Sequence, residues 1–381
     1  MLKTELLAPA GSLEVIYPAV RMGANAVYLG ADIFSARGNA GNFNREQLLE
    51  AVKYCHARNV AVHLACNTLI HDDEMESALN LIKYACEIGI DAIIIQDIGL
   101  VSLIRKAAPN MTLHASTQMS VHTAEAAKML YDMGFERVVL ARELSKTEIK
   151  EIADKLKSMN CPIELEVFVH GALCMSVSGQ CYMSAMLGGR SGNRGLCAQP
   201  CRLPFNAGGN GHDLSLKDLS LISNLRELHE IGVTSFKIEG RMKSPSYVGY
   251  VTRVYRRLMD NYGSKVLKSE EDNLKILFNR DFTSGYLFKD KVMNIESSNH
   301  KGLEIGKVID VNDKKIKVKL YTDLYQEDGI RLKYCNKGMM ANFIYNEKGL
   351  LISKATKGDV IYLDNKINLK DKDILVKTSS S

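Results

Sequence analysis

The stretch AVHLACNTLIHDDEMESALNLIKYACEIGIDAIIIQD, residues 61–97, contains one complete strand–helix–strand unit. Ala61–Asn67 and Ala92–Asp97 are short apolar runs of the kind found in buried strands, and Glu74–Ile88 repeats apolar residues at helical spacing. Gly89 follows the helical stretch, where a residue in left-handed conformation commonly ends a helix. The unit predicts two parallel strands joined by a helix.

The same alternation continues on both sides of this unit. Further strands are predicted at Glu5–Ala8, Ala26–Gly30, Thr112–Ser116, Arg137–Ala141, Glu164–His170 and Ser235–Glu239. Further helices are predicted at Arg45–Ala57, Thr123–Met133 and Thr147–Lys157. Eight strands in about 260 residues favour an α/β fold, a TIM-like (β/α)8 barrel, over an open doubly wound sheet. No G-x-G-x-x-G follows the first strand, which counts against a dinucleotide-binding sheet.

Three segments are expected along the chain. The barrel, with a cysteine-rich loop at 171–202, covers residues 1–262, a linker covers 263–302, and a small β-rich C-terminal domain covers 303–381. This last segment has 15 Lys and Arg against 11 Asp and Glu, so it holds most of the net charge of +5. The excess indicates either a docking surface for a polyanion or ordinary surface lysines.

Composition places the chain among globular proteins of the cytoplasm. The chain is 46% apolar and 24% charged, and no apolar run approaches the roughly 18 residues of a membrane span. No signal-peptide pattern precedes ELLAPAG. Nine cysteines, an odd number, favour a reducing compartment over a disulfide framework.

Four of the nine cysteines lie in the glycine-rich loop that follows the predicted strand Glu164–His170. Cys174, Cys181, Cys197 and Cys201 form two pairs, with six residues inside the first, fifteen between the pairs and three inside the second. This pattern indicates a metal or iron–sulfur site. Zinc pairs usually enclose two to four residues, which only the second pair does. The spacing therefore leaves an iron–sulfur cluster, structural zinc and free thiols as alternatives.

Polar side chains gather at the predicted carboxyl ends of the strands, where the active sites of (β/α)8 barrels lie. His170, Glu239 and Arg142 are the catalytic candidates. The substrate-binding candidates are Arg37, Asn67, Gln118, Arg142, Arg190, Arg194 and Arg241. Such arrays either clamp an acidic small molecule or form internal ion pairs, and a strand-end histidine either transfers protons or serves the packing.

Protease chemistry has little support in the sequence. The chain has no H-E-x-x-H and no G-x-S-x-G. Cys174 with His170 would make a cysteine–histidine nucleophile, but that pair leaves the other three loop cysteines without a role.

Several segments carry a resemblance to a known family. EVFVHGALCMSVSGQCYMS resembles the signature of the collagenase-like peptidase family U32, and ELLAPAGSLE, LHASTQMSV, SGNRGLCAQPCR and FKIEGRMKSPSYV are similar to its other landmarks. The resemblance covers about residues 4–310. It implies a barrel whose four cysteines, here Cys174, Cys181, Cys197 and Cys201, bind a four-iron, four-sulfur cluster.

The resemblance also implies a reaction. Better understood branches of the family are oxygen-independent hydroxylases. Two of them act on RNA and are linked to prephenate as a required metabolite, and a further pair acts in anaerobic ubiquinone synthesis. The ribosomal-RNA branch makes 5-hydroxycytidine and the tRNA branch makes 5-hydroxyuridine. The tRNA branch typically has a tryptophan soon after its last cysteine, and this chain has no Trp, so it looks closer to the ribosomal-RNA branch. The alternatives are a collagenase-like peptidase and a non-catalytic iron–sulfur protein that binds RNA or assists assembly.

Overall fold

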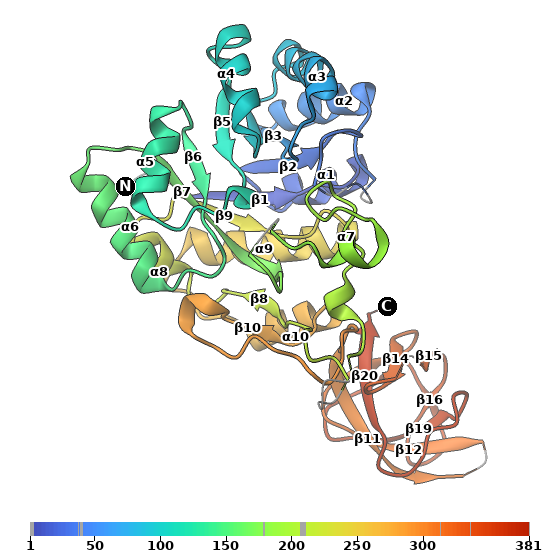
Figure 1. Cartoon of the computed structure of the whole chain (residues 1–381). Helices are drawn as coiled ribbons and strands as arrows, with labels where there is room; N and C mark the ends of the chain where they lie inside the picture. The colour runs from blue at the N-terminus through green and yellow to red at the C-terminus, as the bar shows by residue number, and fades with distance from the viewer. Residues whose placement is uncertain are drawn as a thin grey trace. The chain divides into compact units, whose positions relative to one another are not determined.

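The computed structural model describes residues 4–36, 38, 41–177, 180–205, 211–312, 314–335 and 337–380. The chain divides into two compact units (Figure 1). The first unit is Met1–Leu203, Leu216–Val266 and Phe282–Met293. The second unit is Pro204–Ser215, Leu267–Asp281 and Asn294–Ser381.

The first unit is a closed barrel of eight parallel strands. In order around the ring they are β1 (Glu5–Pro9), β2 (Ala26–Gly30), β3 (Ala61–Cys66), β4 (Ala92–Ile95), β5 (Thr112–Ala115), β6 (Arg137–Val139), β7 (Glu164–Ala172) and β9 (Ser235–Ile238). β9 closes the ring because it pairs in parallel with both β7 and β1. The expected TIM-like barrel is confirmed.

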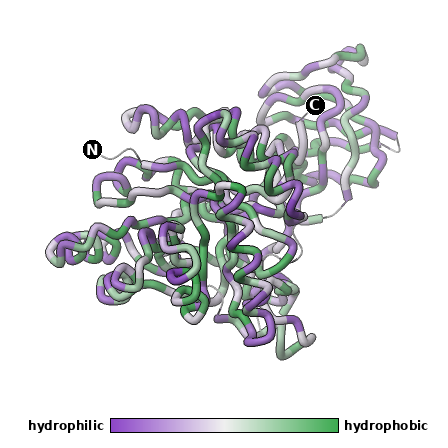
Figure 2. The backbone as a smooth tube through the Cα atoms, turned by 90° about the horizontal axis from the view of Figure 1, so that it is seen from above, coloured by the Kyte–Doolittle hydropathy of each residue, from purple (hydrophilic) through white to green (hydrophobic). Residues whose placement is uncertain are grey.

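Helices alternate with these strands and cover the outside of the barrel. They are α1 (Leu13–Arg21), α2 (Arg45–His56), α3 (Met75–Ile88), α4 (Ile98–Ala107), α5 (Ala124–Asp132), α6 (Lys146–Ser158) and α9 (Pro245–Asp260). Gly89 ends α3 with φ 84°, as expected of a left-handed cap. The hydrophobic colour in Figure 2 runs along the strands, whose residues are almost all buried.

The connection from β7 to β9 departs from the simple alternation. It contains the cysteine loop with the short helix α7 (Met183–Gly188), then β8 (Asp218–Ser220) and α8 (Leu225–Glu230). β8 pairs with β7 in the antiparallel sense, and β10 (Phe282–Thr283) pairs with β8. The cysteine loop thus starts from the carboxyl end of β7, at the mouth of the barrel.

The second unit contains α10 (Lys268–Leu277) and an antiparallel sheet. The order in the sheet is β15 (Gly338–Met340), β14 (Gly329–Leu332), β20 (Ile374–Ser379), β11 (Leu303–Val311), β12 (Lys315–Leu320), β19 (Val360–Asp364), β16 (Ile344–Tyr345) and β17 (Leu351–Ile352), and β13 (Leu324–Tyr325) pairs separately with β18 (Lys354–Ala355). Alternate residues such as Ile316, Val318 and Leu320 point into its core. The expected β-rich C-terminal region is confirmed.

The boundaries of the units are more complex than those expected from the sequence. Residues 263–302 are not a plain connection, because α10 belongs to the second unit and Phe282–Met293 returns to the first. Within the described residues, no helix is long and apolar enough to cross a membrane.

Candidate functional site

A cavity of about 140 Å³ lies at the carboxyl ends of the barrel strands. Barrel strands and the cysteine loop both contribute to its wall. The lining residues are Tyr28, Ala36, Ala65, Asn67, Ile94, Ser116, Thr117, Gln118, Arg142, Phe168, Cys174, Cys181, Gly192, Cys197, Lys237, Glu239 and Arg241. This is the end of a (β/α)8 barrel where active sites are found.

The four loop cysteines gather at this cavity. Cys174, Cys181 and Cys197 line it. Burial raises the pKa of the Cys201 thiol, Arg202 lowers it, and the other three cysteines raise it further, so all four lie within electrostatic range. None of the nine cysteines forms a disulfide. In the part of the chain that the structure describes, no group of three or more His, Cys, Asp or Glu is arranged to hold a single metal ion.

Asn193 of the cysteine loop is bonded to the barrel mouth through its side chain. Asn193 Nδ2 donates hydrogen bonds to Oε1 of Gln96 at 2.9 Å and to Oε1 of Gln118 at 3.0 Å. Both acceptors follow barrel strands, β4 and β5. The two bonds connect the loop to the rim of the barrel.

The arginines of the loop do not line the cavity. Arg194 NH1 donates to Glu74 Oε2 at 2.8 Å and to the carbonyl of Leu69, and Arg194 lowers the pKa of Glu74 to about 2. Arg190 is exposed, and its Nε donates to the carbonyl of Leu196 at 3.0 Å. The structure therefore does not bring these two expected substrate-binding residues to the site.

Arg142 is a buried cation of the cavity wall. Its guanidinium lies 3.8 Å from the centre of the Phe168 ring and donates to the carbonyl of Ala172 at 3.0 Å. Its NH2 lies 3.4 Å from Glu239 Oε2, and the two groups form an ion pair. Among the described residues, Arg142 Nε has no hydrogen-bond partner although it is buried. Arg142 thus carries one unsatisfied buried donor.

Arg241 is the second buried arginine of the wall. Its NH1 donates to Ser35 Oγ at 2.8 Å. A Cβ at Gly30 would collide with both this guanidinium and Ser35, so the position suits only glycine. The end of β2 is thus shaped to let Arg241 enter the mouth.

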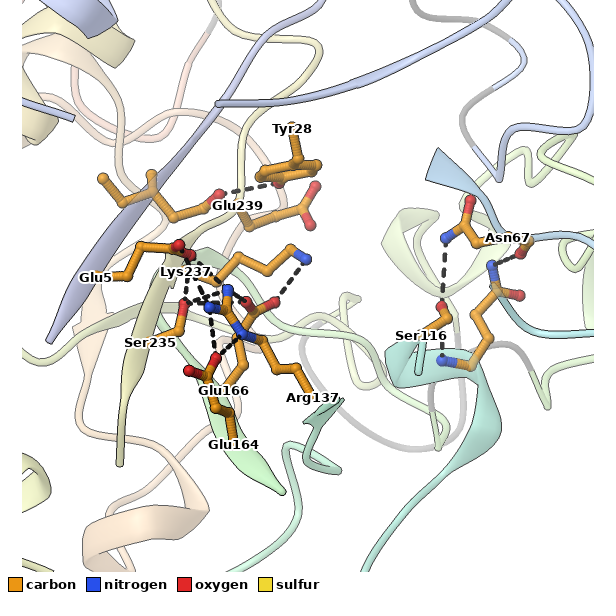
Figure 3. Close-up of polar contacts among 12 residues, drawn as sticks. Glu5, Tyr28, Asn67, Ser116, Arg137, Glu164, Glu166, Ser235, Lys237 and Glu239 are labelled. Carbon is orange, nitrogen blue, oxygen red and sulfur yellow. Dashed lines mark hydrogen bonds and ion pairs between the residues drawn. The ribbon is translucent and has the colours of Figure 1, made fainter. Parts of the chain in front are cut away.

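Lys237 lies deeper and was not expected from the sequence. Its ammonium is 2.7 Å from Glu166 Oε1 and 4.5 Å from the centre of the Tyr28 ring (Figure 3). Burial raises the pKa of Glu166, but Lys237 and Arg137 outweigh that effect and bring it to about 2. Glu166 is therefore a buried carboxylate that pairs with Lys237 of the cavity wall.

The amino ends of the strands carry a further ion-pair network. Arg137 pairs with Glu5, Glu164 and Glu166, and Ser235 Oγ donates to Glu166 Oε2 at 2.9 Å (Figure 3). The network lies at the closed end of the barrel, where residues serve stability rather than catalysis.

Two expected amides do reach the cavity. Asn67 Nδ2 donates to Ser116 Oγ at 3.3 Å, and Gln118 Nε2 donates to the carbonyl of Asn67 at 2.8 Å (Figure 3). They offer hydrogen-bonding groups next to the arginines. Such groups can recognise the edge of a planar base.

His170 lies outside the cavity. Its ring packs among Tyr247, Tyr255 and Phe282, and its Nδ1 is 3.2 Å from the Tyr255 hydroxyl. Burial lowers its pKa to about 4, so it is neutral. The alternation along β7 directs Glu166 and Phe168 inward, and the register shift between Phe168 and His170 ends that alternation.

Arg37, another candidate, lies outside the described residues.

The missed residue Lys237 had a signal in the sequence. In SFKIEGR, Ser235, Lys237, Glu239 and Arg241 alternate with other residues, and alternate residues of a strand share a face. The inward assignment of Glu239 and Arg241 therefore already implied an inward Lys237.

Comparisons with known proteins agree with this architecture. The sequence model of Peptidase family U32 matches residues 11–297. The chain is 34% identical to an uncharacterized protease of Methanocaldococcus jannaschii, over 99% of both chains.

Two relatives are named for RNA modification. The chain is 42% identical to a 23S rRNA 5-hydroxycytidine synthase of Escherichia coli, over 68% of this chain and 39% of that protein. It is 38% identical to tRNA hydroxylation protein P1 of Bacillus subtilis, over 68% of this chain and 64% of that protein. The matched region thus spans less than two thirds of either RNA-modifying relative.

Proposed function

The chain belongs to peptidase family U32, and from this premise we propose that it hydroxylates a pyrimidine base of RNA without molecular oxygen, using an iron–sulfur cluster. One observation carries the proposal: thiols of the cysteine loop and the cations Arg142, Lys237 and Arg241 line the same cavity. A redox group and an anionic ligand would meet there.

The proposed cofactor is a four-iron, four-sulfur cluster bound by Cys174, Cys181, Cys197 and Cys201. Four thiolates are the usual protein ligands of such a cluster. A cluster spreads its ligands more widely than zinc, which holds each sulfur at about 2.3 Å. Three of the four free thiols line the cavity, and the fourth, Cys201, lies within electrostatic range of them, so the loop provides the four thiols that a cluster needs. When bound, the cluster would supply one-electron transfer. Hydroxylation is a two-electron oxidation of the base, so the acidic co-substrate proposed below would have to donate the oxygen atom and take up the two electrons.

The base enters the cavity from RNA. Asn67 and Gln118 provide amide groups for its hydrogen-bonding edge, and Glu239 provides a carboxylate as proton acceptor. 5-Hydroxycytidine of large-subunit ribosomal RNA is the favoured product, and 5-hydroxyuridine of tRNA comes next. The identities with the two RNA-modifying relatives support this order.

An acidic metabolite, with prephenate as the candidate, occupies the cationic side of the cavity. Arg142 keeps its buried Nε available, and Arg241 and Lys237 add positive charge. When a guanidinium group pairs with a carboxylate, it often donates two parallel hydrogen bonds to it. These cations support a carboxylate ligand of this kind.

A peptidase is the less favoured function. The thiol version needs a histidine beside Cys174, and His170 is instead packed against Tyr247 and Tyr255 of α9. The peptidase names of the family, of the archaeal relative and of a relative called collagenase remain in favour of proteolysis.

Two measurements test the proposal. Protein purified without oxygen should be brown and contain iron and sulfide. Mass spectrometry of RNA nucleosides should show a 5-hydroxypyrimidine that disappears from cells lacking the protein. Colourless zinc protein would contradict the cofactor. Brown protein whose loss leaves all nucleosides unchanged would instead favour the non-catalytic alternative.

A further inference from the structure

Helix α7 of the cysteine loop has a buried serine side chain and exposed apolar side chains. Ser184 is buried and accepts a hydrogen bond from the Ala198 amide at 2.9 Å. Tyr182, Met186 and Leu187 are exposed by 68%, 84% and 69%. Residues four apart lie on one helix face, so Tyr182 and Met186 are neighbours. Scattered apolar residues are normal on a surface, but this grouping is the pattern of an interaction site.

The exposed face adjoins the candidate active site. Cys181 lines the cavity, and Tyr182 follows it directly. Gly192 also lines the cavity, and a Cβ placed on it would lie 3.5 Å from the Cys181 carbonyl. A polymer that inserts one unit into the cavity therefore has its neighbouring units beside α7.

The charge of this segment favours an anionic partner. Between Glu166 and Asp213 the sequence has no Asp or Glu, whereas it has three arginines. Arg194 pairs with Glu74, and Arg202 donates to the carbonyls of Leu216 and Leu173. Arg190, two residues after the end of α7, is exposed and keeps its charge at the surface.

We propose that the exposed face of α7 is a stacking platform for the RNA nucleotides next to the modified base. The Tyr182 ring stacks on an unpaired base, Met186 and Leu187 extend the apolar surface, and Arg190 contacts a phosphate. The partner's identity rests on the proposed function. Aromatic side chains beside cations are the general means of binding single-stranded nucleic acid.

Insertion of a base into the cavity explains why such a platform is needed. A base that leaves its stack also exposes the faces of its neighbours to water. Stacking on Tyr182 covers one of those faces. A protein partner would also use the Tyr182 ring, so the salt dependence that Arg190 contributes through a phosphate contact is what separates the two occupants.

The test uses the iron-loaded protein and a short single-stranded RNA of mixed sequence. Tyr182→Ala should weaken RNA binding by on the order of tenfold, because stacking contributes roughly 1–3 kcal/mol per base. Tyr182→Phe should bind like the wild type, since the ring face is retained. Neither change should alter the salt dependence, whereas Arg190→Gln should reduce its slope by about one.

Exposed residues of α5 give matched controls. Tyr131 and Met129 are exposed by 36% and 53%, and Tyr131 lies beside Glu136 at the other end of the barrel. Tyr131→Ala and Met129→Ala should leave RNA binding unchanged, while Met186→Ala weakens it.

The outcomes separate the platform from the chemistry. The platform would be overturned if Tyr182→Ala bound RNA as tightly as the wild type. It would also be overturned if Tyr182→Phe bound as weakly as Tyr182→Ala, or if the weaker binding of Tyr182→Ala came with a loss of iron. If the wild type hydroxylates RNA while Tyr182→Ala binds normally, only the platform fails. If binding depends on the Tyr182 ring but no nucleoside is modified, only hydroxylation fails.

Discussion

Lys237 Nζ lies 2.7 Å from Glu166 Oε1 inside the barrel, and the two side chains are exposed by only 5% and 1%. Lys237 lines the candidate cavity, whereas Glu166 lies below it and also pairs with Arg137. A carboxylate outside the cavity thus positions a lysine in its wall.

The first prediction concerns the removal of that carboxylate. Glu166→Gln should lower the free energy of unfolding by roughly 3–5 kcal/mol, because it leaves the buried Lys237 without its counter-charge. Denaturant titration measures the change. Asp154→Asn is the control, because it breaks an exposed ion pair: the side chains of Lys150 and Asp154 are 58% and 64% exposed. This change should lower the free energy of unfolding by less than about 1 kcal/mol.

The same pair predicts a pH dependence. The folded pKa of Glu166 is about 2, below its ordinary value of 4.5. The carboxylate therefore contributes stability that is complete above pH 4.5 and is lost as the pH falls through about 2. The difference in unfolding free energy between the wild type and Glu166→Gln should shrink across this window. A difference that stays constant would contradict the role of the charge.

His170 predicts a second pH window at higher pH. Its folded pKa is about 4 against an ordinary 6.5, because burial disfavours the charged ring. The unfolded chain binds a proton first on acidification, so stability should fall between pH 6.5 and 4. His170→Asn should show a shallower fall by denaturant titration over this range. An identical slope in the variant would mean that His170 titrates normally in the folded protein.

Much of the fold was predictable because its signals are local. Strand runs such as Ala92–Asp97 and the glycine that ends α3 depend on residues close in sequence, and the structure has both. The division of 263–302 was not predictable, since the pairing of β10 with β8 joins segments far apart in the chain. Composition alone makes that region look like a linker.

The candidate site was predictable only in part, for a similar reason. Strand-end position correctly brought Asn67, Gln118, Arg142 and Arg241 to one cavity. It could not show that Arg194 forms an ion pair with Glu74, which lies in the helical turn before α3. Nor could it reveal the register shift in β7 just before His170. That residue lies outside the cavity.

The loop attachment gives a further prediction. Asn193→Ala removes both hydrogen bonds to Gln96 and Gln118, so the loop should be held less firmly at the mouth. We expect faster iron loss to a chelator with little change in global stability. Asn160→Gly, at an exposed left-handed turn position after α6, is the control and should keep the wild-type rate. Equal rates in both variants would show that Asn193 does not support the site.

The last prediction concerns the four cysteines as a set. Each iron of a cuboidal cluster takes one protein ligand, so Cys174→Ser, Cys181→Ser, Cys197→Ser and Cys201→Ser should each lower iron content and abolish RNA hydroxylation. Circular dichroism should show that the barrel remains folded, because none of the four lies in the interior of a barrel strand.

Cysteines outside the loop provide the controls for that set. Cys55 is fully buried in α2, and burial raises its pKa to about 12, so it is a packing residue rather than a thiolate. Cys55→Ser should cost roughly 1–3 kcal/mol of stability and keep the iron. Cys66, at the end of β3, is fully buried and is not among the residues that line the cavity. If one loop variant keeps its full iron content while Cys66→Ser loses iron, the assignment of the four ligands is wrong.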